Sequence, residues 1–120
     1  MTLEACYEKM EADYGDVKRR FQSDRLIQKF ALKFLNDPSY GNLCQALKEE
    51  RYEDAFREAH TLKGVSQNLS FTKLHEESGK LTEALRGGAS PDAEALFGQV
   101  SVQYEKVCQA IRQFQGELEG

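Results

Sequence analysis

The chain has 120 residues, of which 40% are hydrophobic and 30% are charged, and its formal net charge is −4 at pH 7. This composition excludes a disordered tail, and the interspersed charges give no basic face for nucleic acid. The acidic N-terminus does not resemble a secretory signal, and no apolar run approaches the ~20 residues of a membrane span. We therefore expect a single cytoplasmic domain over residues 1–120, with no membrane or nucleic-acid partner.

Apolar residues recur at intervals of three or four along most of the chain, and no segment alternates with the period of two that marks a strand. Helices are predicted near residues 3–14, 24–36, 38–50, 52–69, 72–86 and 91–115, with an irregular or helical link up to residue 22. Their start and stop signals are Ser23, Asp37-Pro38, Gly87-Gly88 and Ser90-Pro91.

Short connections between these long helices indicate that neighbours in the sequence pack antiparallel. The expected fold is all-α: an up-and-down four-helix bundle over about residues 24–115, with additional short helical segments at the N-terminus.

The sequence gives no signal for a disulfide or a metal site. The three cysteines, Cys6, Cys44 and Cys108, are odd in number and far apart, so we expect them to be buried as small hydrophobic side chains. At the spacings where a helical partner ligand for His75 would stand, the chain has Ser78 and Gly79. No resident metal or cofactor is therefore expected.

The predicted helix over residues 52–69 carries the residues with the most chemical character. On a helical wheel of about 100° per residue, His60 falls at the margin of the core face and points largely toward water. Gln67 lies two turns later on the same side and Arg57 one turn before it. Lys63 lies between this side and the core face, and its long stem lets the ammonium reach the neighbourhood of the imidazole.

Gly64 needs an explanation, because a glycine inside a helix costs about 1 kcal/mol relative to alanine. One explanation is that a side chain here would crowd His60 from the next turn, so that its absence gives access to a bulky partner or to a phosphoryl group on the ring. The other is that Gly64 lets a neighbouring helix pack closely.

These residue types suit phosphoryl transfer. An imidazole ordinarily titrates near pH 6.5, so much of it is neutral and nucleophilic at pH 7. Lys63 can balance the charge on the oxygens of an incoming phosphoryl group, and such transfer depends mainly on positioning and charge stabilisation. The sequence shows no carboxylate or metal cluster for the other half of the reaction, so we expect a partner to supply it.

The segment FREAHTLKGVSQNLSFTKL resembles the signature of histidine-containing phosphotransfer (HPt) domains, Ala-His-x-Leu-Lys-Gly followed by small residues and Asn-Leu. The similarity covers residues ~20–115. It implies that His60 is phosphorylated through Nε2, with Lys63, Gly64 and Gln67 in support, and more weakly that Thr82 orients the imidazole.

The resemblance also implies the partners. Family members exchange phosphoryl groups with an aspartate on the receiver domain of a response regulator or hybrid sensor histidine kinase, and the receiver brings Mg²⁺. Two residues depart from the family pattern: Ser70 stands where many members have Gly, and Val65 where many have Ser or Ala. Neither departure removes the nucleophile, the lysine or the access glycine.

The leading hypothesis is therefore a phosphorelay intermediate that acts as a carrier rather than an enzyme. A non-catalytic helical interaction module that has lost phosphotransfer is the alternative, and an enzyme with its own active site is disfavoured because no second catalytic group is visible. The initiating Met and the length of the chain lead us to expect a free-standing protein, and a monomer is the simplest expectation for its oligomeric state.

Overall fold

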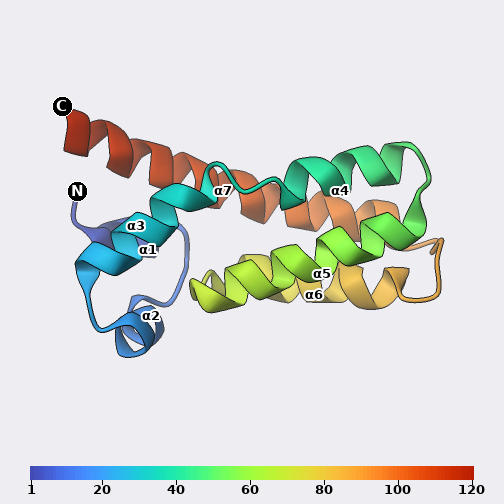
Figure 1. Ribbon diagram of the computed structural model, residues 1–120, viewed down its shortest axis with the longest axis horizontal. Coiled ribbons are helices and arrows are strands. Elements are labelled where there is room, and N and C mark those ends of the chain that lie inside the picture. Colours follow the sequence, from blue (N-terminus) through green and yellow to red (C-terminus); the bar gives the residue numbers. More distant parts are fainter.

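The computed structural model describes residues 1–120 and contains seven helices and no strand (Figure 1). The helices are α1 (Leu3–Lys9), α2 (Tyr14–Phe21), α3 (Asp24–Phe34), α4 (Ser39–Lys48), α5 (Tyr52–Asn68), α6 (Thr72–Leu85) and α7 (Ala93–Glu119). The prediction of an all-α fold is confirmed.

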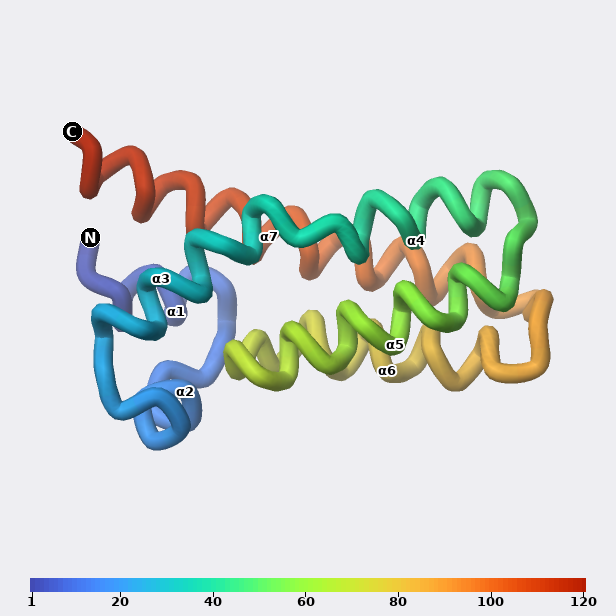
Figure 2. Tube along the Cα trace, in the orientation of Figure 1, coloured from blue at the N-terminus to red at the C-terminus, as the bar shows by residue number.

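Helices α4 to α7 form the bundle, and α1 to α3 gather at one end of it. Helix α5 packs against both α4 and α6, and α6 packs in turn against α7. The 27-residue α7 runs along the length of the molecule, and both chain termini lie at the end occupied by α1 and α3 (Figure 2). The predicted antiparallel four-helix bundle with extra N-terminal helices is therefore correct, but the bundle begins with α4 rather than near residue 24.

Aromatic side chains fill the space between α4 and α7. The ring of Tyr40 stacks on that of Tyr104 with centroids 3.8 Å apart and on that of Phe97 at 5.8 Å. Its hydroxyl donates to the Ser101 hydroxyl at 2.8 Å. Stacked rings bury a large apolar area, and they join the first helix of the bundle to the last.

The N-terminal helices share the core of the bundle. Tyr7 of α1 is completely buried and donates its hydroxyl to the Leu69 carbonyl at 2.9 Å. Phe71 is also buried, with its ring centroid 5.8 Å from that of Tyr7 and 5.2 Å from that of Phe34. Burial of one such phenyl side chain contributes about 1.5–3 kcal/mol to folding. The connection after α5 is thus covered by both α1 and α3.

The predicted helix over residues 3–14 is wrong in its second half. Helix α1 ends at Lys9, and Glu11 adopts a left-handed conformation with φ 54°. The Ala12 N–H then donates to the Tyr7 carbonyl at 2.9 Å, which closes the helix end in the Schellman pattern. Asp13 caps a new helix, α2, by accepting from the Asp16 N–H at 2.9 Å.

The other start signals lie close to their predicted places: α3 begins as predicted, α4 begins at Ser39 with Pro38 rather than Asp37 as its N-cap, and α7 begins two residues late. Ser23 caps α3 through the Leu26 N–H at 3.3 Å, and Asp37 accepts from the Ser39 N–H at 2.9 Å at the start of α4. Helix α7 begins at Ala93 rather than residue 91, because the Ser90 side chain first accepts from the N–H of residue 92 in a turn, and it ends at Glu119 rather than residue 115.

Burial of the cysteines was predicted for all three and holds for two. Cys6 and Cys108 are buried, whereas Cys44 is half-buried on α4. Burial raises the pKa of the Cys6 thiol to about 11, so this side chain stays protonated. Cys44 is more open because it lines a cavity between α4 and α7.

Candidate functional site

His60 lies in the middle of α5 with its side chain exposed, while its neighbours Ala59 and Leu62 are fully buried. Helix α5 therefore has a sharply two-sided surface at this point. On the buried side, the Ser66 hydroxyl donates to the Leu62 carbonyl at 2.7 Å, so this polar group does not disturb the core. The prediction that His60 faces water is confirmed.

The imidazole of His60 lies next to an aromatic ring one turn earlier on α5. The centroids of the His60 and Phe56 rings are 6.3 Å apart, and the two planes differ by only 13°. On α6, the guanidinium of Arg86 lies over the Phe56 ring, 5.2 Å from its centroid. Phe56 therefore links the histidine to a cation from the neighbouring helix.

A stripe of α6 residues runs alongside this part of α5. It consists of three residues of α6 at positions i, i+4 and i+8, which share one helical face, and of the C-cap residue that follows the helix on the same side: His75, Gly79, Glu83 and Arg86. Because α5 and α6 pack together and run antiparallel, the first two of these residues meet Lys63 and the last meets Phe56.

Lys63 is supported by α6 at two positions. A Cβ atom placed on Gly79 would lie 3.6 Å from the Lys63 Cε and 3.8 Å from its Cδ, so the lysine stem crosses the surface of α6 at this glycine. The Nδ1 of His75 lies 3.2 Å from the Lys63 carbonyl oxygen. A carbonyl only accepts, so this contact requires the proton on Nδ1. His75 thus ties α6 to the backbone of α5 at Lys63.

Gly64 is exposed, and a Cβ atom added to it would meet no heavy atom within 4 Å. The explanation that this glycine lets another helix pack closely is therefore wrong, because nothing packs there. The same observation refines the other explanation. A methyl group at this position would not touch the imidazole, so only a longer side chain can obstruct the approach to His60.

Glu83 and Arg86 form an ion pair beside the histidine that the sequence analysis did not identify. The Arg86 Nη2 and Nε donate to the two Glu83 carboxylate oxygens at 2.7 and 3.1 Å. The hydrogen bonds and charge of Arg86 lower the pKa of the Glu83 carboxyl, and the charges of Lys63 and His60 act in the same direction. A carboxylate thus lies within electrostatic range of both.

The remaining predicted residues are not all brought to the imidazole. Gln67 is exposed on the same helix, but Arg57 is engaged with acidic residues of its own helix, donating to Glu53 at 3.2 Å and also pairing with Asp54. Thr82 is completely buried and donates its hydroxyl to a carbonyl of α6, that of Ser78, at 2.7 Å. The expectation that Thr82 orients the imidazole is therefore not supported.

The contacts of Ser70, the first departure from the family pattern, explain why a serine is accepted at this position. It has φ 58°, a conformation that favours glycine, and it closes α5 through a bond from its N–H to the Gln67 carbonyl at 3.1 Å. Its hydroxyl donates to Asp16 of α2 at 2.6 Å and accepts from Arg20 of the same helix at 3.1 Å. Ser70 therefore makes two side-chain hydrogen bonds with α2, which a glycine at this position could not make.

Val65, the second departure, points away from His60. It is half-buried and lines a small groove between α3 and α5 together with Phe30 and Phe34. The replacement of a smaller residue by valine therefore adds apolar contact with α3 and leaves the histidine surface unchanged.

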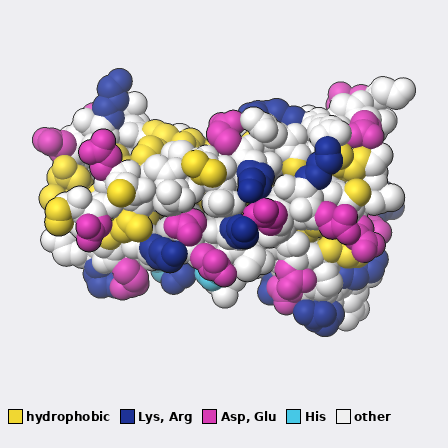
Figure 3. Space-filling model, turned by 180° about the vertical axis from the view of Figure 1, so that it is seen from behind, with side chains coloured by type: hydrophobic (Ala, Val, Ile, Leu, Met, Phe, Trp, Pro, Cys, Tyr) yellow, Lys and Arg dark blue, Asp and Glu magenta, His cyan; other side chains and the backbone are white.

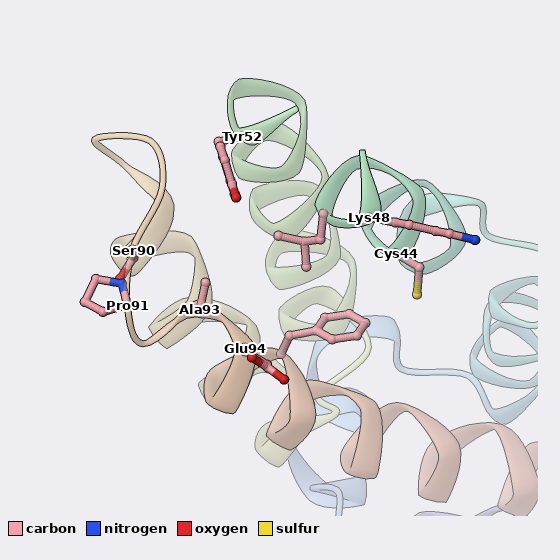
Figure 4. A pocket seen from close by; sticks show the side chains of 9 residues that line it. Cys44, Lys48, Tyr52, Ser90, Pro91, Ala93 and Glu94 are labelled. Atoms are coloured by element: carbon pink, nitrogen blue, oxygen red, sulfur yellow. The ribbon is translucent and has the colours of Figure 1, made fainter. Parts of the chain in front are cut away.

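A cavity of about 490 Å³ lies between α4, the first residue of α5 and the start of α7 (Figure 4). Cys44 and Lys48 of α4, Tyr52 of α5 and Glu94 of α7 line it. His60 and Lys63 are not among its lining residues, so the exposed surface around His60 is separate from this cavity.

The surface around the histidines is mixed in charge. Histidine atoms reach the surface at the lower edge of the view in Figure 3, between basic and acidic side chains.

No group of three histidine, cysteine or acidic side chains is arranged to hold a metal ion. No helix combines the length and the apolar character that crossing a membrane requires.

The family model for the Hpt domain matches residues 38–117, which is two thirds of the chain and includes α4, α5, α6 and most of α7. No curated protein and no solved structure matches the chain significantly. The protein belongs to the Hpt domain family. Domains of this family carry phosphoryl groups in two-component phosphorelays, where they interact with receiver domains and hybrid kinases and act as carriers rather than enzymes.

Proposed function

We propose that this protein is a phosphorelay intermediate in which His60 is the phosphorylated residue. The observation that carries the proposal is the exposed imidazole of His60 on α5, with the half-buried Lys63 one turn away and no neighbouring atom over Gly64. The Hpt match includes all three residues. An accessible nucleophile with an adjacent cation supplies the histidine half of a phosphoryl-transfer site.

In the proposed reaction, the Nε2 lone pair of His60 attacks the phosphorus of an aspartyl phosphate on a receiver domain. The N–P bond forms as the bond between phosphorus and the aspartate oxygen breaks, and the released carboxylate keeps the electron pair. Transfer to a second receiver reverses these steps. The receiver supplies Mg²⁺, and Lys63 balances the charge of the phosphoryl oxygens in transit. Gln67 lines the same surface beyond Gly64.

The test is incubation of the protein with a phosphorylated receiver domain and Mg²⁺. We expect the chain to take up a phosphate that is labile in acid and stable in base, as a phosphohistidine is, and His60→Gln to abolish it. His75→Gln is the matched control, since His75 is the other histidine of the chain, and it should retain the label. A folded protein that takes no label from any receiver would instead support the non-catalytic interaction module.

A further inference from the structure

Helix α3 carries three exposed cations that no carboxylate of the chain neutralises. Arg25, Lys29 and Lys33 recur every four residues, so they form one stripe about 12 Å long, which we call the α3 stripe. None of them makes an ion pair, whereas every cation of α2 does. Like charges at this spacing weaken a helix, so α3 gains when negative charge from elsewhere meets the stripe.

The α3 stripe has an apolar edge. Leu26 is 41% exposed, and the Phe30 ring is half-buried, with the ammonium nitrogens of Lys29 and Lys33 at 5.8 and 5.9 Å from its centroid. Cations beside apolar side chains fit an acidic protein surface that also has an apolar part. An anionic membrane fits less well, because basic clusters that bind lipid usually hold about four to eight cations.

A hollow at the same end of the molecule has the opposite charge. It has a volume of about 550 Å³ and lies between α1, the start of α2 and the start of α6. Glu4, Glu8 and Glu76 line it, are exposed and make no ion pair. Glu4 and Glu8 are again like charges four residues apart on one helix. Ala12 and Tyr14 give this acidic hollow an apolar part of its wall.

No free cation of the wall offsets these carboxylates. Lys73 is the one basic residue that lines the acidic hollow, and it is paired with Glu11, which lines the hollow as well. The charge pattern follows the sequence: residues 1–13 carry four acidic side chains and one basic one, whereas residues 14–37 carry six basic and three acidic ones. The two surfaces are thus complementary in charge, and both have an apolar part.

The α3 stripe and the acidic hollow lie on different sides of the molecule. In Figure 1, α3 and α5 lie toward the viewer, and α1 and α6 lie behind them. The view from behind in Figure 3 shows acidic side chains at the right, which is the end that holds α1 to α3. The stripe therefore cannot reach the hollow of its own chain. Most of both surfaces belongs to helices that precede the family match over residues 38–117.

We propose that the chain associates with a second copy of itself through these two surfaces, the α3 stripe of one copy lying against the acidic hollow of the next. The contact neutralises both sets of unpaired charges and covers Leu26. It is heterologous, because each copy offers one surface and keeps the other free for a third copy. The inference is independent of phosphorylation at His60, so it stands or falls separately from the proposed function.

The first test is sedimentation velocity of the whole chain over a range of concentrations up to millimolar. At an ionic strength of about 0.01 M, screening acts only beyond about 30 Å, and we expect the average mass to rise above that of a monomer as the concentration rises. At about 1 M salt, where screening acts beyond about 3 Å, we expect only the monomer. A monomer under both conditions overturns the proposal, and so does association that survives the salt.

Two variants separate the surfaces. The stripe variant replaces the cations of α3 and the hollow variant replaces the free carboxylates of the wall: Arg25→Gln, Lys29→Gln and Lys33→Gln in the first, and Glu4→Gln, Glu8→Gln and Glu76→Gln in the second. Each alone should remain a monomer at low salt, because one of the two surfaces is missing. Mixed in equal amounts, they should form a dimer and nothing larger, since one intact stripe meets one intact hollow and no second pair remains.

The control variant combines Lys48→Gln, Lys80→Gln and Arg112→Gln, three exposed cations on other helices. It changes the net charge as much as the stripe variant does and should associate like the wild type. Circular dichroism shows that all three variants are folded. The proposal is wrong if the control variant also becomes monomeric, if the stripe variant still associates, or if the mixture contains no dimer. A monomeric wild type that binds phosphatidylserine vesicles would assign the α3 stripe to a membrane surface instead.

Discussion

The guanidinium of Arg20 on α2 caps the helix that carries His60, with its Nη1 2.7 Å from the backbone carbonyl oxygen of Asn68. The same nitrogen lies 2.9 Å from the Gln67 carbonyl oxygen, and Nη2 lies 3.0 Å from the Asp16 carboxylate. The carbonyls at the end of a helix carry partial negative charge and lack helical partners, so a cation here is favourable. Helix α2 lies outside the family match and nevertheless completes α5.

Replacing Arg20 with alanine is therefore expected to destabilise the fold by about 1 kcal/mol, because hydrogen bonds to charged groups are lost from two terminal carbonyls. Chemical denaturation followed by circular dichroism measures the change. Arg19→Ala is the control: Arg19 is more exposed and makes only a 3.6 Å ion pair with Asp16. If Arg20→Ala and Arg19→Ala lost equal stability, the hydrogen bonds of Arg20 to the end of α5 would add no stability of their own.

The Asp16 carboxylate predicts a pH dependence. The hydrogen bond from the Ser70 hydroxyl lowers the pKa of the Asp16 carboxyl, and the charges of Arg20 and Arg19 lower it further. A carboxyl whose pKa is lower in the folded state contributes stability above its unfolded pKa, near 3.9, and this contribution is lost as the pH falls through the folded value. Asp16→Asn should thus lower stability at pH 7 and flatten the loss of stability below pH ~4.

Thermal unfolding between pH 7 and pH 3 checks this prediction. The control is Asp92→Asn, which changes a carboxylate that makes no ion pair. If Asp16→Asn loses as much stability at pH 3 as at pH 7, relative to the wild type, the carboxylate charge is not the source of the effect.

The long helices could be predicted from the sequence, whereas several of their ends could not. Four helix ends use a non-glycine residue with positive φ: Glu11, Gln22, Glu50 and Ser70. Glycine and asparagine are the residues that normally signal such a position, so glutamate, glutamine and serine gave no stop signal. This is why the segment over residues 3–14 was predicted to be one helix. The end at Ser70 is fixed by tertiary contacts, namely the bonds between its hydroxyl and α2.

The residues of the candidate site also divide into those that could be predicted from the sequence and those that could not. His60, Lys63 and Gly64 share one helix, so their spacing alone places them together. Glu83 and Arg86 could not be assigned, because their approach to α5 depends on how α6 rotates in the bundle. The burial of Thr82, which does not support its expected role at the imidazole, could have been predicted from the sequence. Ser78 lies one turn before Thr82 in the buried stripe of α6, so Thr82 faces the core as well.

The open space over Gly64 leads to a graded prediction. Gly64→Ala should stabilise the helix by about 1 kcal/mol and leave phosphotransfer close to the wild-type rate, because the added methyl group meets no neighbour. Gly64→Gln should retain the added stability but slow transfer by about tenfold or more, since a long side chain can cover the approach to His60. Rapid-quench measurements with a labelled receiver give both rates.

Gly98→Gln on α7 is the control for this series. Gly98 is also an exposed helical glycine with no neighbour around an added Cβ, but it lies on a helix that does not pack against α5. It should show the gain in stability without slower transfer. Wild-type transfer by Gly64→Gln would show that the access explanation for this glycine is wrong.

Gly79 provides a test of Lys63 that leaves the lysine itself in place. The Lys63 stem crosses α6 where Gly79 has no side chain, and a Cβ there would already be in van der Waals contact with it. Gly79→Leu should therefore displace the ammonium from the His60 surface and slow transfer about as much as Lys63→Ala, by about tenfold. Gly98→Leu makes the same substitution on α7 and should transfer normally. Additive losses in Gly79→Leu combined with Lys63→Ala would contradict this account, because two changes that act through one ammonium cannot remove it twice.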